Sequence, residues 1–162
     1  MGHEWFQLYL NGTHISNAGV KEYDVAKKKI SENVEKIYNS ISLLLENLNL
    51  KMSDCFVMGF SQGGMMAFEL GQILQNQLAG LAIISSRIIS KEHKPNNAFL
   101  KTPIFISHGG HDAVLPISNY NDSVQVLKNY NYNFENYLIE KDEHTMSQET
   151  IALFQNFIKK NI

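Results

Sequence analysis

Short apolar segments alternate with helical segments along this chain, and that alternation limits the folds open to it. A nearly continuous apolar run predicts a strand at Cys55–Phe60, and further strands are predicted at Leu78–Ile84, Pro103–Ser107 and Phe134–Ile139. Strands joined by helical crossovers pair in parallel and carry helices on their faces. The sequence therefore predicts an α/β fold with three layers, α-β-α, around a mostly parallel sheet of about four strands.

The helices are predicted from apolar residues that recur every three or four positions. The longest pattern opens at Tyr23 or Asp24, runs to about Leu48 and closes at Asn47–Asn49. Further helices are predicted at residues 62–76, Ser118–Asn129 and Ser147–Lys159. Residues 1–22 are expected to be irregular, and residues 85–101 to form a polar loop with room for a short helix. A length of 162 residues without repeats or linkers predicts a single domain over residues 1–162.

Charge and composition argue against several classes of function. The net charge is −2, and the longest basic stretch, Lys27–Lys29, reads as the solvated face of a helix, so nucleic acid is not an expected partner. No apolar run approaches the ~18 residues of a membrane span, and the first ten residues do not form a signal peptide. The one cysteine, Cys55, excludes an intrachain disulfide and fits a cytoplasmic location, where we expect it to be an inert core residue.

The first predicted strand runs into Gly59-Phe60-Ser61-Gln62-Gly63, which fits the pattern G-x-S-x-G. In this pattern the serine occupies a strained strand-to-helix turn, and small residues two before and two after it avoid collisions between strand and helix. The following helix directs its N–H groups at the site, so the backbone amide of Gln62 is a candidate oxyanion donor. We predict that Ser61 is a nucleophile. The alternative is a glycine-rich turn with an incidental serine.

A nucleophilic serine needs a base and an acid that orients the base. In parallel sheets the ligand site lies outside the carboxyl ends of the strands, here in loops 59–64, 85–90, 107–116 and 140–147. Asp112 follows the third predicted strand and His144 the fourth, so both are expected at the same sheet edge as Ser61. We predict a triad of Ser61, Asp112 and His144.

Other residues compete for these roles. Asp112 is also placed to cap the helix after Pro116, and Asp142 is a competing acid, although it is too close in sequence to His144 to orient it easily. His108 ends a strand and is expected to fix its loop by hydrogen bonding. His111 directly precedes Asp112 in the chain, which makes a hydrogen bond between its imidazole and that carboxylate geometrically awkward. The remaining histidines lie in segments expected to be irregular: His3, His14 and His93.

A metal site is an alternative, because the scheme above places four potential ligands near one another: His108, His111, Asp112 and His144. No HExxH motif or paired-cysteine spacing supports it, and there is no phosphate-binding glycine loop of the Walker or GxGxxG type. The sequence therefore predicts neither a metal nor a cofactor.

The segments GFSQGG, HGGHDAVLP and EHTMSQE resemble the phospholipase/carboxylesterase family of α/β-hydrolases, which includes the acyl-protein thioesterases. The resemblance implies the order Ser61, Asp112, His144, with Glu143 in place of the commoner glycine before the histidine. Trp5-Phe6 resembles the family's W-[FY]-D segment near the substrate pocket, with Gln7 replacing the aspartate, so Trp5 is a candidate pocket residue. The implied substrates are short-chain esters, lysophospholipids or S-acylated proteins.

The resemblance also implies a departure from the family pattern. Members carry further N-terminal strands and a loop, typically L-H-G, that supplies the second oxyanion amide, and this chain begins close to the Trp5-Phe6 segment. We therefore expect a partial α/β-hydrolase fold that lacks the N-terminal strands. Loss of one oxyanion donor costs ~10²–10³ in rate. The strand Cys55–Phe60 would be an exposed apolar edge that invites a homodimer.

Three hypotheses follow. The first is a serine hydrolase that cleaves carboxylic esters or thioesters through an acyl-enzyme. The second is a truncated or degenerate relative with little activity, which serves as a binding or assembly module or has no role. The third is a pure interaction protein on an α/β scaffold. The pocket would be built from residues 1–20 and 85–101, whereas Met65, Met66 and Phe68 are expected to be core.

Overall fold

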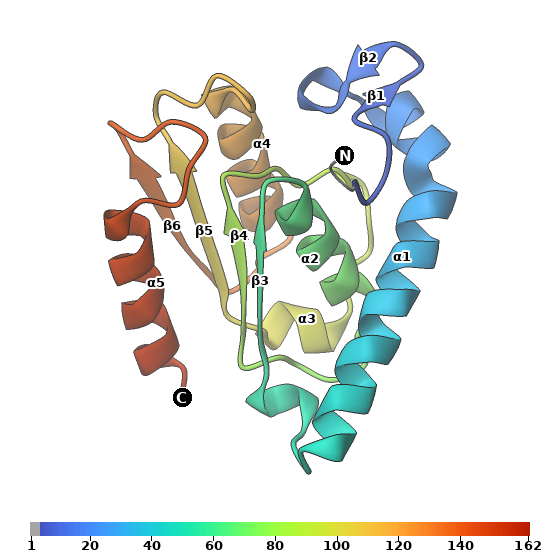
Figure 1. Cartoon of the computed structure of the whole chain (residues 1–162), viewed down its shortest axis with the longest axis vertical. Helices are drawn as coiled ribbons and strands as arrows, with labels where there is room; N and C mark the ends of the chain where they lie inside the picture. The colour runs from blue at the N-terminus through green and yellow to red at the C-terminus, as the bar shows by residue number, and fades with distance from the viewer. Residues whose placement is uncertain (1–3) are drawn as a thin grey trace.

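The structure, a computed structural model, describes residues 4–162 and has the three layers expected from the sequence (Figure 1). The central sheet is parallel throughout, in the order β3-β4-β5-β6. Its strands are β3 (Phe56–Phe60), β4 (Gly80–Ile84), β5 (Ile104–Gly109) and β6 (Phe134–Ile139). All four predicted strands are confirmed, and the bounds of β6 are those predicted.

The helices lie on both faces of this sheet. They are α1 (Val20–Asn47), α2 (Gln62–Ile73), α3 (Asn97–Lys101), α4 (Ile117–Asn129) and α5 (Gln148–Lys160), with 3₁₀ turns at Ile15–Asn17 and Met52–Asp54. Figure 1 shows α5 on one face and α1 and α2 on the other. Over residues 4–162, no helix combines the length and the apolar character that a membrane crossing requires.

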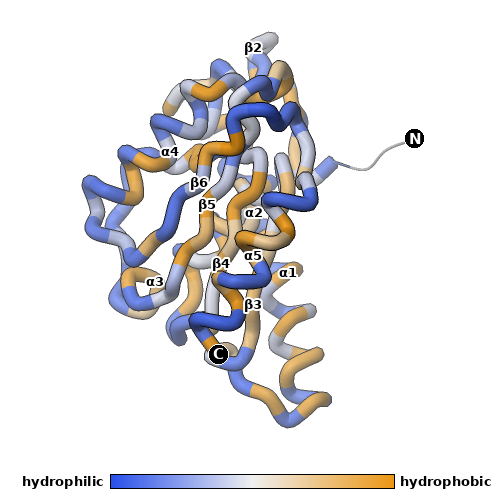
Figure 2. The backbone as a smooth tube through the Cα atoms, turned by 90° about the vertical axis from the view of Figure 1, so that its left-hand side faces the viewer, coloured by the Kyte–Doolittle hydropathy of each residue, from blue (hydrophilic) through white to orange (hydrophobic). Residues whose placement is uncertain are grey.

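The core divides into two parts because alternate residues of a strand face opposite sides of the sheet. Leu81, Ile83, Ile104 and Ile106 pack toward α1, α2 and α4, together with Met65, Met66 and Phe68, which are buried as predicted. Ala82, Ile84 and Phe105 pack toward α5 against Phe157. In Figure 2 the apolar residues accordingly gather along the central strands, while hydrophilic residues mark the connecting loops.

The expectation of an irregular segment over residues 1–22 is wrong for part of it. Strands β1 (Tyr9–Leu10) and β2 (Thr13–His14) form a small antiparallel hairpin. Asn11 and Gly12 connect them with φ values of 50° and 81°, and a two-residue hairpin turn of type I′ requires positive φ at both positions. The long helix also begins at Val20, before the predicted start at Tyr23 or Asp24. His3 lies outside the described residues.

Strand β3 is an edge of the sheet. Its sequence predicts burial on both faces, but within residues 4–162 it pairs with β4 alone, and 47% of Met58 and 39% of Phe60 are exposed. The half-buried position of Cys55 just before this strand differs from the predicted core position for the same reason. The expected exposed apolar edge is therefore confirmed.

Candidate active site

Ser61 occupies the turn between β3 and α2, and its backbone is strained. Its φ is 53° and ψ is −123°, in a region that residues with a side chain rarely adopt. Two backbone hydrogen bonds hold the turn: the Ser61 amide donates to the Ile84 carbonyl of β4, and the Gly64 amide donates to the Ser61 carbonyl. Gln62 is the first residue of α2, so its N–H points out of the helix N-terminus without an intrahelical acceptor.

The glycines around Ser61 do not all have the role that the motif assigns them. A Cβ atom at Gly59 would lie 2.1 Å from the Gly63 carbonyl oxygen, so the close approach of strand and helix requires glycine there. At Gly63 a Cβ atom would meet nothing within 4 Å. The crowded position is Gly64, where a Cβ atom would lie 2.6 Å from the Cβ of Ser86. The prediction that small residues prevent a collision is thus correct for Gly59 and wrong for Gly63.

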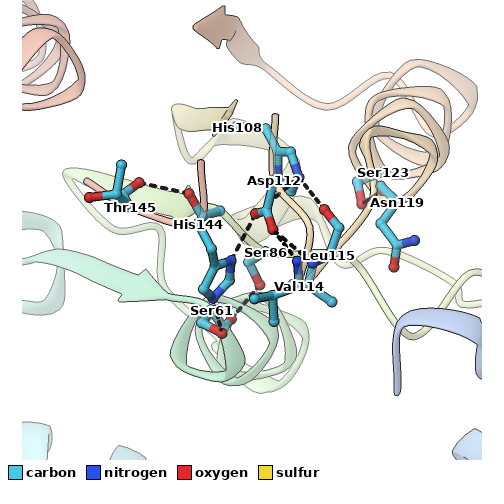
Figure 3. Close-up of polar contacts among 11 residues, drawn as sticks. Ser61, Ser86, His108, Asp112, Val114, Leu115, Asn119, Ser123, His144 and Thr145 are labelled. Carbon is cyan, nitrogen blue, oxygen red and sulfur yellow. Dashed lines mark hydrogen bonds and ion pairs between the residues drawn. The ribbon is translucent and has the colours of Figure 1, made fainter. Parts of the chain in front are cut away.

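Three loops bring the predicted triad residues together, as Figure 3 shows. The loop after β3 carries Ser61, the loop after β5 carries Asp112, and the loop after β6 carries His144. His144 Nε2 lies 2.9 Å from Ser61 Oγ, and His144 Nδ1 lies 2.8 Å from Asp112 Oδ2. Because a carboxylate only accepts, Nδ1 carries the proton and Nε2 is free to accept one from the serine hydroxyl.

Burial of the triad side chains increases from His144 to Asp112. The Asp112 side chain is fully buried, whereas 18% of the His144 side chain is exposed. The second carboxylate oxygen of Asp112, Oδ1, accepts the backbone amides of Val114 and Leu115, each at 2.8 Å. The carboxylate is therefore fixed from both sides. It does not cap α4, whose N-cap is Pro116.

Of the competing residues, His108 lies beside the triad, with its Nε2 3.5 Å from Asp112 Oδ2. His111 is exposed, and Asp142 has one carboxylate oxygen, Oδ2, that is buried without a hydrogen-bond partner among the described residues. His108 is buried and donates from Nε2 to the Leu115 carbonyl, so the prediction that it fixes its loop is confirmed. Burial lowers the pKa of His108, although the Leu115 carbonyl and Asp112 oppose this shift.

The Trp5-Phe6 segment lies beside the nucleophile turn. The Gln62 side chain accepts from the Trp5 amide at 2.8 Å and donates to the Phe6 carbonyl at 2.7 Å. Trp5 is 43% exposed and borders a hollow of about 360 Å³ whose wall includes Phe6, Leu10 and Val25. The wall also carries Glu4 and Lys29, and the hollow is linked to the nucleophile turn through Trp5, whose amide binds the Gln62 side chain.

Several contacts of the site were missed by the sequence analysis. The ring of Phe60 lies 5.0 Å from that of His144, centroid to centroid. Ser86 Oγ donates to the Ser61 carbonyl, and Ser85 Oγ donates to the carbonyl of Thr145, the neighbour of His144. The position of loop 85–90 at the active edge of the sheet was the available signal, but no residue in it matches a motif.

No cluster of metal-binding side chains was found in the part of the chain that the structure describes. The imidazole of His144 is committed to Ser61 and Asp112, and that of His108 to a backbone carbonyl. The arrangement is suited to moving a proton from a serine hydroxyl to a histidine.

Comparison with known proteins gives the same family as the motifs. The family model of the phospholipase/carboxylesterase proteins matches residues 1–162. Acyl-protein thioesterase 1 of Saccharomyces cerevisiae is 28% identical over 158 residues, which cover 88% of this chain and 67% of the yeast protein. Its counterpart in Debaryomyces hansenii is 26% identical and is covered to 68%. The chain thus spans about two thirds of the length of these relatives.

Solved structures establish the fold. Arabidopsis thaliana SOBER1 superposes with a TM-score of 0.81 at 18% identity, over 98% of this chain and 73% of that protein. A Bacillus cereus carboxylesterase gives a TM-score of 0.75 at 15% identity, over 84% of this chain and 63% of that protein. The sheet, the flanking helices and the family match lead to one conclusion: the chain belongs to the phospholipase/carboxylesterase family and is a carboxylesterase/thioesterase-type hydrolase.

Proposed function

We propose that the chain hydrolyses carboxylic esters or thioesters through an acyl-enzyme on Ser61, with His144 as base and Asp112 as its orienting acid. The observation that carries the proposal is the continuous chain of contacts from Ser61 Oγ through both ring nitrogens of His144 to Asp112 Oδ2. Hydrogen-bond reach between nucleophile and base, with the base oriented by a third group, is the arrangement that activates a serine.

The first half of the reaction forms the acyl-enzyme. Ser61 Oγ attacks the carbonyl carbon while His144 Nε2 takes the hydroxyl proton, and Asp112 stabilises the imidazolium through the Nδ1–H bond. The negative charge that develops on the carbonyl oxygen is accommodated by the N–H of Gln62 at the N-terminus of α2. The tetrahedral intermediate collapses when His144 gives its proton to the leaving alcohol or thiol.

The second half releases the acid. Water attacks the acyl carbonyl while His144 Nε2 accepts a proton from it, and collapse of the second intermediate returns that proton to Ser61 Oγ. The products are a carboxylic acid and an alcohol or thiol. No step requires a cofactor.

The substrate class is proposed from two observations. The relatives named acyl-protein thioesterase 1 point to S-acylated proteins, and the family description adds phospholipid esters. The hollow beside Trp5 has an apolar side formed by Phe6, Leu10 and Val25, which suits an acyl chain. We therefore propose fatty acyl esters or thioesters, carried by a lysophospholipid or a protein cysteine.

The experiment is a rapid-mixing assay with p-nitrophenyl esters of increasing chain length. The proposal predicts a burst of p-nitrophenol that approaches one equivalent per chain, because acyl-enzyme accumulates on Ser61. Ser61→Ala should give no burst. A folded wild-type chain without burst or turnover would reject the proposal and favour the alternative of an inactive binding module.

We also propose that two copies pair through the exposed edge of β3. Phe56, Met58 and Phe60 alternate along this strand and so share one face, on the side of α5. Antiparallel pairing about Met58 would set Met58 against Met58 and Phe56 against Phe60 of the second copy. The strand has no charge and no proline, the usual protections of an exposed edge.

Sedimentation over a range of concentrations tests the pairing. A dimer is expected to form in the wild-type chain and to be lost in Met58→Lys. Leu138→Lys is the matched control, because Leu138 is 41% exposed on β6, the other edge strand, and should leave the dimer intact. A monomer at every concentration, or equal effects of the two substitutions, would overturn the pairing.

A cytoplasmic location is proposed on the basis of cysteine use. The half-buried Cys55 is the only cysteine, so the fold gains nothing from an oxidising compartment. Fractionation of cells with an antibody to the chain should find it with cytoplasmic markers, and recovery in a secreted fraction would reject this location.

A further inference from the structure

Three consecutive polar residues directly follow strand β4 and are buried beside the candidate active site. Ser85 and Ser86 are each 1% exposed, and Arg87 is 3% exposed. Buried polar groups need hydrogen-bond partners, and the partners of these three side chains belong to three different parts of the site.

Ser85 holds the loop that carries the base. Its Oγ donates at 2.9 Å to the carbonyl of Thr145, next to His144, and its own amide donates to the Ser107 carbonyl of β5. Its φ is 43°, in the left-handed region that is unfavourable for a residue with a side chain. In this conformation the hydroxyl reaches the loop that carries His144.

Ser86 holds the nucleophile turn. Its Oγ donates to the Ser61 carbonyl at 2.5 Å, as Figure 3 shows. The Cβ of Ser86 packs against Gly64, where only glycine fits because a Cβ atom at Gly64 would lie 2.6 Å from it. The first turn of α2 therefore rests directly on Ser86, which fixes how far Ser61 projects from the sheet.

Arg87 holds the N-terminal segment. Its Nη1 donates to the carbonyls of Ile15 and Ser16 at 2.6 and 2.9 Å, and its Nη2 donates to the Ala18 carbonyl at 3.2 Å. Among the described residues no carboxylate is within ion-pair distance of this guanidinium. Burial lowers the pKa of Arg87, an effect that Asp122 partly opposes, so carbonyl dipoles are its principal partners.

The segment that Arg87 clamps is the one that carries Trp5. The Ile15 amide donates to the Leu8 carbonyl, so the clamped residues are bonded back to an earlier part of the segment. Gln62 and Asn33 bind the backbone of Trp5 and Phe6 at its N-terminal end. A guanidinium presents a planar fork of donors, and one such group can therefore fix three carbonyls at once.

We propose that Ser85, Ser86 and Arg87 are the positioning residues of this site, each holding one part in place: the base loop, the nucleophile turn and the substrate wall at Trp5. The inference rests on the proposed serine hydrolase activity. It adds that loss of the Arg87 contacts raises KM, whereas loss of either serine contact lowers kcat, because Arg87 holds the substrate wall and the serines hold the base and the nucleophile.

Substitution of Arg87 tests the tie to the substrate wall. In Arg87→Met the guanidinium is lost and the volume is kept, so KM for a long-chain p-nitrophenyl ester should rise about tenfold while kcat for p-nitrophenyl acetate changes less than about twofold. Arg87→Lys keeps the charge and one donor group, so its KM should lie between those of Arg87→Met and the wild type. A fall in kcat alone, or unchanged constants for both esters, would overturn the role of Arg87.

Substitution of the serines tests the other two ties. Ser86→Ala and Ser85→Ala should each lower kcat and the rate of fluorophosphonate labelling about tenfold with KM unchanged, because the nucleophile or the base is less well placed. Thr102→Val is the control: it removes another buried hydroxyl, but at the amino end of β5, and should lower stability alone. Equal kinetic losses in Ser85→Ala, Ser86→Ala and Thr102→Val would show that the serines affect stability alone and would overturn their positioning role.

Amide hydrogen exchange separates this inference from the proposed activity. In a Ser61→Ala background, Arg87→Met should speed exchange over residues 4–18 and leave α5 unchanged, whether or not the chain has any turnover. A wild-type chain without turnover, together with this exchange pattern in the Ser61→Ala background, would reject the hydrolase alone. Unchanged exchange over residues 4–18 would reject the Arg87 clamp alone.

Discussion

The carboxylate of Asp112 binds His144 with one oxygen and the backbone with the other. Oδ2 accepts from His144 Nδ1 at 2.8 Å, while Oδ1 accepts the amides of Val114 and Leu115. Both oxygens are therefore held by N–H donors. The backbone amides of Val114 and Leu115 can only donate, so the end that faces them must be an acceptor, and this sets the orientation of any amide placed here.

Substitution of this residue by asparagine should reveal that orientation. In Asp112→Asn the carbonyl oxygen would stay on the amides of Val114 and Leu115, and the NH₂ group would face His144 Nδ1. The imidazole would then carry its proton on Nε2 and could not accept one from Ser61. We expect kcat to fall by ~10³–10⁴ with little change in fold, the size of loss seen when a triad base is held in the wrong tautomer. Circular dichroism provides the folding control, and a loss below tenfold would contradict this role of Asp112.

The two glycines at the start of α2 should respond in opposite ways to alanine. Gly63→Ala meets open space and should raise the free energy of unfolding by about 0.5–1 kcal/mol, because alanine favours a helix. Gly64→Ala should lower it by about 1–3 kcal/mol, since the methyl group would press on Ser86. Urea unfolding of both variants measures the difference, and equal changes would contradict the packing described here.

A buried carboxyl should make stability depend on pH. Glu69 on α2 is 8% exposed and accepts hydrogen bonds from Tyr23 and Ser90. Burial raises the pKa of Glu69 above its ordinary value of 4.5, although the hydrogen bonds from Ser90 and Tyr23 and the charge of Lys27 oppose this. As the pH rises above 4.5 the unfolded chain releases this proton first, so the folded state loses stability until the pH passes the raised pKa.

Glu69→Gln removes this titration and keeps the shape of the side chain. The free energy of unfolding of the wild type, relative to this variant, should therefore fall between pH 5 and pH 8. Urea unfolding at both values measures it. A difference that stays constant or grows with pH would contradict the raised pKa.

Much of the fold, and the meeting of the three candidate triad residues, could be predicted from the sequence. The strand Phe134–Ile139 has its predicted bounds because polar turn residues enclose it on both sides, although Glu135 and Asn136 interrupt its apolar residues. Ser61, Asp112 and His144 were predicted because each directly follows a strand, and parallel strands bring their carboxyl ends to one edge. Their positions relative to the strands were enough to predict that three residues far apart in sequence meet.

Other features depended on signals that were weak or misread. The turn Asn11–Gly12 is a typical hairpin signal, but strands of two residues carry too few apolar positions to show alternation. The first turn of α1 exposes Val20, so the apolar period does not mark it. Ser85, Ser86 and Arg87 match no motif, because their roles come from partners up to 72 positions away in sequence.

The central claim is that Ser61 is a nucleophile activated by His144, and covalent labelling tests it most directly. The folded chain is incubated with a fluorophosphonate probe, and its intact mass and the modified peptide are measured in the wild type, Ser61→Ala and His144→Ala. We predict one adduct per chain on Ser61, none in Ser61→Ala, and a labelling rate at least about 10³-fold lower in His144→Ala. A folded wild-type chain that remains unlabelled, or that is labelled as fast without His144, would contradict the claim.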